Sequence, residues 1–270
     1  MFLCIRYNPD RFPGAPLLGF FDGIFGTKEL RKSVCTFGFE PSRDKTQRLQ
    51  KLNRDLTAQG FGVVIFTETA VGVRNGNITF YVDDVPGQWG GAENNGWGSS
   101  TINWGKLKHT ITVGMLNLAD FLLHDVFERK GSVPGSKIFA KMDIEGLEYE
   151  VIPEVIMRNA LCQIDALATE IHPFKYPRSS PLWMSRSNFI SKIKSSIKSV
   201  PNCKTSLTDI DDESYRLFDD DIKNSSHSID FGSDDNKALL FQARELLSSG
   251  QCKHIYLDIG TNIGVQIRKL

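Results

Sequence analysis

Residues 254–270 read HIYLDIGTNIGVQIRKL, an apolar strand-like run followed by an acid and two spaced glycines. Glycines between a strand and a helix let backbone N–H groups approach a ligand at the positive end of the helix dipole. The stretch therefore predicts the opening of a nucleotide-binding α/β domain. Such a motif normally begins its domain, whereas here it occupies the last residues of a sequence of 270.

The acid in this loop discriminates between cofactors. A dinucleotide fingerprint has the pattern G-x-G-x-x-G, but here the pattern is Asp258-x-Gly260-x-x-x-Gly264. A carboxylate is unfavourable beside a pyrophosphate and favourable beside the ammonium and sulfonium of S-adenosylmethionine. The loop therefore favours S-adenosylmethionine over NAD. The alternative is that Asp258 only caps the following helix.

Two further apolar runs end in acids. Glu40 follows residues 34–39, and Asp143 follows residues 137–142. The carboxyl ends of parallel strands are where α/β sheets bind ligands, and an acid there can accept both ribose hydroxyls. Either acid alone also fits a helix cap. Three strand-ending acids in one chain favour a shared ligand site.

Strand-like runs alternate with segments of helical spacing. Strands are predicted at residues 34–39, 63–70, 137–143, 164–170 and 255–259, and helices at about 146–157, 187–197 and 237–247. This alternation predicts a parallel sheet with helices on both faces. The pair Asn75-Gly76 is a hairpin signal, with residues 78–82 as the returning strand. Residues 222–236 have the polar composition of a linker.

Composition excludes several classes. The 32 basic and 32 acidic residues balance, which argues against nucleic acid as the main partner. The five cysteines form no C-x-x-C pair, so we expect neither zinc nor a disulfide framework, and we expect a reducing, cytoplasmic location. No apolar stretch approaches the ~20 residues of a membrane span, and residues 1–10 are too soon polar for a signal peptide. Four histidines show no metal-ligand spacing: His109, His124, His227 and His254.

Four motifs carry a family resemblance. They are FGFEP at 37–41, TETAVG at 67–72, KMDIEG at 141–146 and YLDIGTNIG at 256–264. Together they resemble the FkbM-type methyltransferases. The resemblance implies an α/β fold with a Rossmann-like sheet, mostly parallel with one antiparallel hairpin strand, and helices on both faces. It also implies S-adenosylmethionine as cofactor and O-methylation of a hydroxyl on a small molecule or sugar.

The resemblance implies roles for particular residues. The cofactor-binding set comprises Asp258, Gly260, Asn262, Gly264, Glu40, Glu68, Thr69 and Ala70. The catalytic set comprises Asp143, Glu170 and His172, with Glu145 in reserve and no metal ligand. Methyl transfer to an alcohol requires alignment and removal of the hydroxyl proton. A histidine has a suitable pKa for that base, although His172, before Pro173, could instead only hydrogen-bond a loop. The loop at 87–104, with Trp89, Trp97 and Trp104, could cover the acceptor or be a plain mobile loop.

The motif order departs from the family, because the segment that normally comes first is last. We expect a circular permutation in which residues 1–221 form the bulk of the domain and 222–236 link the hairpin at 205–219 to residues 237–270. That final segment would supply the first helix, first strand and cofactor loop. A tandem-array fragment or a misassembled gene would also give this order. A non-catalytic relative and, more remotely, a nicotinamide dehydrogenase are the other functional hypotheses.

Overall fold

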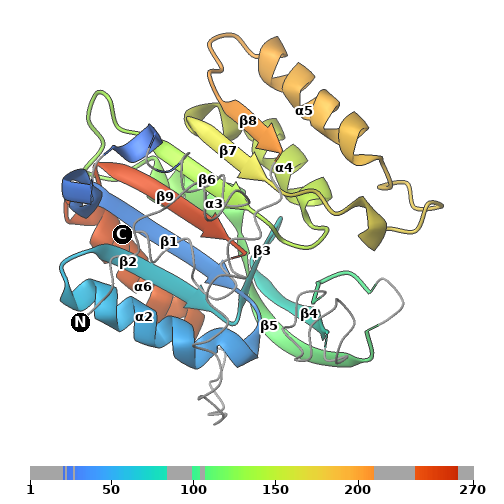
Figure 1. Cartoon of the computed structure of the whole chain (residues 1–270), viewed down its shortest axis with the longest axis horizontal. Helices are drawn as coiled ribbons and strands as arrows, with labels where there is room; N and C mark the ends of the chain where they lie inside the picture. Colours follow the sequence, from blue (N-terminus) through green and yellow to red (C-terminus); the bar gives the residue numbers. More distant parts are fainter. Residues whose placement is uncertain are drawn as a thin grey trace, which may run out of the picture.

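The computed structural model describes residues 21, 23–26, 28–83, 99–103, 107–209 and 235–260. Within these residues the main element is a six-stranded sheet in which every pairing is parallel (Figure 1). Its strands, in spatial order, are β2 (Gly62–Thr67), β1 (Val34–Glu40), β9 (His254–Ile259), β6 (Ile138–Met142), β7 (Ala166–Thr169) and β8 (Ser206–Asp209). The predicted parallel α/β sheet is confirmed.

Helices cover both faces of this sheet, which explains why its strands are apolar along their whole length. One face packs against α3 (Leu118–Phe121) with the π-helical segment Leu122–Val126, α4 (Glu148–Met157), α5 (Arg186–Ser199) and α6 (Asp235–Ser248). The other face packs against α2 (Thr46–Ala58) and the aromatic rings of Phe21 and Phe25. Every residue of β1, β2, β6 and β7 is buried. Apolar burial on two faces therefore supplies the main stabilisation of the domain.

Strand β9 occupies the centre of the sheet, as the sequence predicts. It pairs with β1 from Val34↔His254 to Phe39↔Ile259, and with β6 from Ile138↔Ile255 to Met142↔Ile259. β9, the last strand in the described part of the chain, thus separates β1 from β6 (Figure 1). Without β9, neither β1 nor β6 would have its inner partner.

A second, smaller sheet corrects the predicted hairpin. Its order is β3 (Thr69–Gly72), β5 (His109–Asn117), β4 (Gly76–Val82), so β5 lies between the two strands that Asn75-Gly76 was expected to join. The reason is that Asn117 holds the intervening turn. Its backbone N–H donates to Asn75 Oδ1 at 2.9 Å, and its side-chain amide donates to the Val73 carbonyl at 2.9 Å. The predicted strand 63–70 is likewise split at Glu68, whose φ is 52°.

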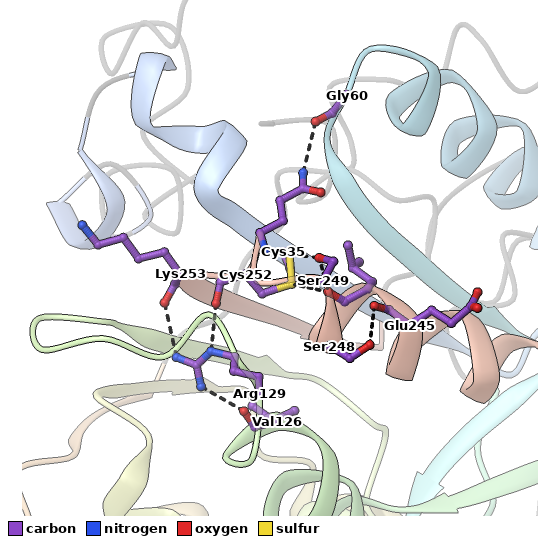
Figure 2. The surroundings of a disulfide bond; sticks show 11 residues. Cys35, Gly60, Val126, Arg129, Glu245, Ser248, Ser249, Cys252 and Lys253 are labelled. Carbon is purple, nitrogen blue, oxygen red and sulfur yellow. Dashed lines mark hydrogen bonds between the residues drawn. A yellow bond between two sulfur atoms is a disulfide. The ribbon is translucent and has the colours of Figure 1, made fainter.

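Two disulfide bonds overturn the expectation that the cysteines do not pair. Cys35 bonds to Cys252, and Cys162 bonds to Cys203 (Figure 2 shows a disulfide's surroundings). Linear spacing could not reveal these pairs, because the partners lie 217 and 41 residues apart and meet only through strand order. The first pair joins β1 to the lead into β9, and the second joins the leads into β7 and β8. Disulfides persist in oxidising compartments, so the cysteines give no support to a reducing, cytoplasmic location.

Several predicted segments lie outside the described residues: most of the linker at 222–236, the hairpin beyond residue 209, the three tryptophans of the 87–104 loop, and residues 261–270. Among the helices that the structure describes, none has the length and apolarity needed to cross a membrane.

Candidate functional site

A pocket opens at the carboxyl ends of β1, β6 and β9, beside the start of β3. It has about 670 Å³ of empty space, a figure that includes space open to solvent. Its lining includes five of the predicted site residues: Glu40, Thr69, Ala70, Asp143 and Gly260. The fold therefore brings three strand ends and the start of β3, far apart in the sequence, to one pocket.

The turn after β9 forms one wall of the pocket. Gly260 has a φ of 84°, and its N–H donates to the Phe39 carbonyl at 3.1 Å. A Cβ at this position would overlap the carbonyl oxygen of Asp143. Only glycine therefore allows the β9 turn to approach β6 so closely. Asp258, two residues earlier, is fully buried and lies in register between Gly38 and Lys141.

Asp143 does not cap the helix that follows it. Helix α4 begins at Glu148 with Leu147 as N-cap and no side-chain cap. Asp143 instead lies 3.1 Å from the ammonium of Lys141, which also donates to the Gly260 carbonyl at 3.0 Å. Lys141 thus joins the strand-ending acid of β6 to the turn after β9. The helix-cap interpretation of Asp143 is wrong.

Glu148 shapes the turn between β6 and α4. Its carboxylate is fully buried and accepts backbone N–H bonds from Ile144 at 2.9 Å and Gly146 at 2.8 Å. The same carboxylate lies 3.0 Å from His172 Nδ1. A carboxylate only accepts hydrogen bonds, so Nδ1 carries a proton and the ring orientation of His172 is fixed. The other ring nitrogen, Nε2, is consequently directed toward three more carboxylates.

These carboxylates belong to the predicted catalytic set and its reserve. His172 Nε2 lies 3.4 Å from Glu170 Oε1, 3.7 Å from Asp143 Oδ1 and 3.8 Å from Glu145 Oε1. His172 is buried, whereas the three acidic side chains are about a quarter exposed. Only Asp143 and Glu145 of this group line the pocket, so the imidazole lies behind them. The structure therefore brings the three predicted catalytic residues together.

Burial and neighbouring charges shift the pKa values of this cluster in opposite directions. Burial lowers the pKa of His172, but Glu148 and Glu145 more than compensate, and the pKa lies well above its usual value. Burial raises the pKa of Asp143, but Lys141 and His172 oppose it, and the net pKa is lowered. Burial also raises the pKa of Glu145, to about 7, despite opposition from His172 and Lys175. In the absence of bound ligands, the cluster thus favours an ionised Asp143 beside an imidazolium.

Lys175 and Glu145 form a buried pair beside this cluster. The Lys175 ammonium is fully buried and lies 2.9 Å from Glu145 Oε2. The pair is costly to bury unless each charge is compensated. Lys141, Glu148 and Lys175 were missed by the sequence analysis. The run KMD, with its lysine two residues before the acid on the same side of a strand, was the one available signal for Lys141.

Of the remaining predicted cofactor residues, the structure describes Glu68 and Glu40. Glu68 lies outside the pocket lining, with Oε2 3.0 Å from Arg43 Nε and Oε1 3.2 Å from the Thr46 hydroxyl. Glu40 lines the pocket, and its Oε1 accepts the Ser42 N–H at 2.8 Å. Ser42, not Glu40, is the N-cap residue of the helical segment that follows, so this bond is a local turn contact. Asn262 and Gly264 lie outside the described residues, as does the helix that Asp258 was alternatively expected to cap.

A site of acids and a glycine turn, at the carboxyl ends of a parallel sheet covered by helices, defines a Rossmann-like α/β enzyme domain. The methyltransferase FkbM domain model matches residues 18–203, which is more than half of the chain, and the chain therefore belongs to the FkbM methyltransferase family. Comparison with curated proteins and with solved structures gives no significant match. Strand β9 lies outside the matched residues.

Proposed function

We propose that this methyltransferase uses S-adenosylmethionine to methylate a hydroxyl oxygen of a small molecule or glycan. The observation that carries the proposal is the convergence of Glu40, Asp143 and Gly260 on one pocket beside the buried Asp258. These are the strand-ending residues that the resemblance assigns to cofactor and chemistry. The balanced charge of the chain gives no reason to expect a nucleic-acid acceptor.

The residues in and beside the pocket support a cationic, ribose-bearing cofactor as its ligand. The glycine turn brings backbone close to the cavity, and the neighbouring acid Asp258 would favour the ammonium of the methionine end. Glu40 would accept the ribose hydroxyls, and Thr69 and Ala70 at the start of β3 would lie near the adenine. When bound, S-adenosylmethionine supplies a methyl group already activated by its sulfonium. Glu68 is engaged with α2 and is the weakest member of the predicted set.

The acceptor side of the pocket would be the carboxylate–imidazole cluster. Transfer to an alcohol needs the oxygen aligned in line with the methyl group and its proton removed. Asp143 lines the pocket and is the group best placed to hold the acceptor hydroxyl. His172 lies behind it, with Nε2 3.7 Å from Asp143 and 3.4 Å from Glu170. We propose that these three residues together orient the acceptor. An ionised carboxylate of the cluster would receive the hydroxyl proton, because the His172 imidazolium already carries its own.

Calorimetric titration with S-adenosylhomocysteine and with NAD tests the cofactor. We expect the wild-type protein to bind the first and not the second. Asp258→Ala should weaken S-adenosylhomocysteine binding by ~1.5–3 kcal/mol, the usual range for hydrogen bonds to a charged group, which is roughly ten- to a hundredfold. Asp209→Ala is the matched control, because Asp209 also ends a strand but lies at the sheet edge, paired with Arg186 at 2.7 Å.

Equal affinity in wild type and Asp258→Ala would show that Asp258 is only structural, provided that both proteins melt cooperatively. Binding of NAD instead would contradict the cofactor proposal altogether. A screen of hydroxyl acceptors with a labelled methyl donor then separates an active enzyme from a relative that binds cofactor without turnover.

A further inference from the structure

We propose that Asp143, Glu170 and His172 form a binding site for one divalent metal ion. Their ligand atoms lie within 4.8 Å of one another. Asp143 follows β6, and Glu170 and His172 follow β7, so two neighbouring strands of a rigid sheet present the three donors. The sequence analysis assigned these three residues to catalysis and tested only the other four histidines for ligand spacing.

The separations suit ligands of a common ion better than direct hydrogen bonds. His172 Nε2 lies 3.4 Å from Glu170 Oε1 and 3.7 Å from Asp143 Oδ1. Good N–H···O bonds are about 2.7–3.2 Å long. Two ligands that bind one tetrahedral ion at about 2.1 Å lie roughly 3.4 Å apart. The ligand atoms of all three residues lie within 4.8 Å of one another, so an ion could be held once the two carboxylates close around it.

The histidine is already oriented as a metal ligand. Glu148, fully buried, holds Nδ1 at 3.0 Å, and backbone N–H groups of Ile144 and Gly146 hold Glu148 in turn. A carboxylate on the far nitrogen of a metal-binding histidine fixes the tautomer and raises the basicity of the ligating nitrogen. The His172 side chain, only 6% exposed, points Nε2 into the cluster. This preorientation distinguishes the cluster from a chance grouping of acids.

The neighbouring lysines leave room for a cation. Lys141 binds Asp143 through Oδ2, whereas the oxygen nearest His172 is Oδ1. Lys175 binds Glu145 through Oε2, while Glu145 Oε1 is 3.8 Å from Nε2 and could become a fourth ligand. Among the described residues, Lys141 and Lys175 face the carboxylates of Asp143, Glu145, Glu148 and Glu170. A divalent ion would replace the proton on His172 Nε2 and offset the remaining negative charge.

One nitrogen and two or three carboxylate oxygens favour a transition-series ion over the all-oxygen preference of Ca²⁺. We therefore expect Mn²⁺ or Zn²⁺ to bind more tightly than Ca²⁺. If the proposed function holds, the ion would lower the pKa of an acceptor hydroxyl bound beside Asp143. Binding itself does not depend on that function.

The test is titration of the full chain with Mn²⁺ alone, followed by electron paramagnetic resonance. We expect one bound ion per chain, weaker or no binding of Ca²⁺, and nitrogen modulation of the pulsed signal from one imidazole. Glu170→Gln should weaken Mn²⁺ binding at least tenfold, because it removes a charged ligand. Glu150→Gln is the matched control, because Glu150 lies on α4 and its carboxylate bonds Tyr176 rather than the cluster.

The wild-type protein and both variants should have the same thermal transition to within a few degrees, which excludes misfolding as a cause. Absence of Mn²⁺ binding, equal binding of Ca²⁺, or an affinity that Glu170→Gln leaves unchanged would overturn the proposal. S-adenosylhomocysteine titration of the same samples keeps the two proposals apart. Retained cofactor binding without Mn²⁺ binding rejects only the metal site, and the reverse result rejects only the cofactor.

Discussion

Removal of the Cys35–Cys252 disulfide tests how strand β9 is attached to the rest of the sheet. The bond links residues 217 apart and joins β1 to the segment that leads into β9. In the chain-entropy description, closing a loop of this length restricts the unfolded state by roughly 5 kcal/mol, and the 41-residue loop of Cys162–Cys203 by roughly 4 kcal/mol. Cys35→Ala/Cys252→Ala should therefore lose up to about 5 kcal/mol of unfolding free energy.

The native state should change little in this variant, because other contacts hold the same segment. Arg129 is buried, and its guanidinium donates to the carbonyls of Cys252 at 3.0 Å, Lys253 at 3.3 Å and Val126 at 2.9 Å (Figure 2). Urea unfolding followed by circular dichroism gives the free energy and its denaturant dependence. Because the unlinked unfolded chain is less compact, the denaturant dependence should also rise. Affinity for S-adenosylhomocysteine should stay within twofold.

Cys162→Ala/Cys203→Ala is the internal comparison. Its shorter loop predicts a loss of unfolding free energy that is smaller by about 1.5 kcal/mol. Its cysteines are also less buried than the fully buried Cys35 and Cys252, so their replacement leaves smaller cavities, which increases the difference between the two variants. Non-reducing peptide mapping of the wild-type protein must first recover both linkages. An unchanged unfolding midpoint in Cys35→Ala/Cys252→Ala would refute the reasoning, as would recovery of Cys35 and Cys252 as free thiols.

Two further perturbations address the β9 segment. Gly260→Ala should destabilise the protein by at least about 1 kcal/mol more than Gly250→Ala. Both glycines have φ near 84°, but only a Cβ at 260 meets a neighbour, the Asp143 carbonyl. Equal melting temperatures of the two variants would contradict this close packing. Deleting residues 237–270 should give an insoluble or molten product, whereas placing them before Met1 without the 222–236 linker should restore cofactor binding. A cooperatively folding fragment 1–236 would show that the final segment is an appendage.

The sequence revealed those features that depend on local pattern. Apolar runs ending in acids predicted β1, β6 and β9, and the common carboxyl edge of parallel strands predicted that Asp143 and Glu40 would share a pocket. Features that depend on strand order were not predictable in this way. Cys35 meets Cys252 only because β9 inserts beside β1, and Asn75-Gly76 does not close a hairpin because β5 takes that place.

Buried charges were the second feature that the sequence pattern did not reveal. From the sequence pattern, Lys141 reads as part of a strand interior. Glu148 reads as an ordinary acid in the first turn of a helix. In the folded protein both side chains position the site, because Lys141 ties Asp143 to the Gly260 carbonyl and Glu148 fixes His172. Such pairs are tolerated in a core only when each charge is compensated. Their partners come from other strands and turns, so neither arrangement is visible before the strands are placed.

The position of β9 couples completion of the fold to formation of the site. β1 and β6 make their inner pairings with β9, and the Asp143 N–H bonds the Ile259 carbonyl at 2.9 Å while Lys141 bonds the Gly260 carbonyl. Neither the wall of the pocket at Gly260 nor these contacts of Asp143 can form until residues 254–260 are in place.

Contacts between β1 and β9 span more than 200 residues, and such non-local pairings form slowly. We propose that residues 237–270 are the first helix and strand of this domain in circularly permuted order, held by the disulfide and by Arg129. In this order the strand that completes the sheet also builds one wall of the pocket, so we expect that a chain that has not inserted β9 can neither fold fully nor bind the proposed cofactor.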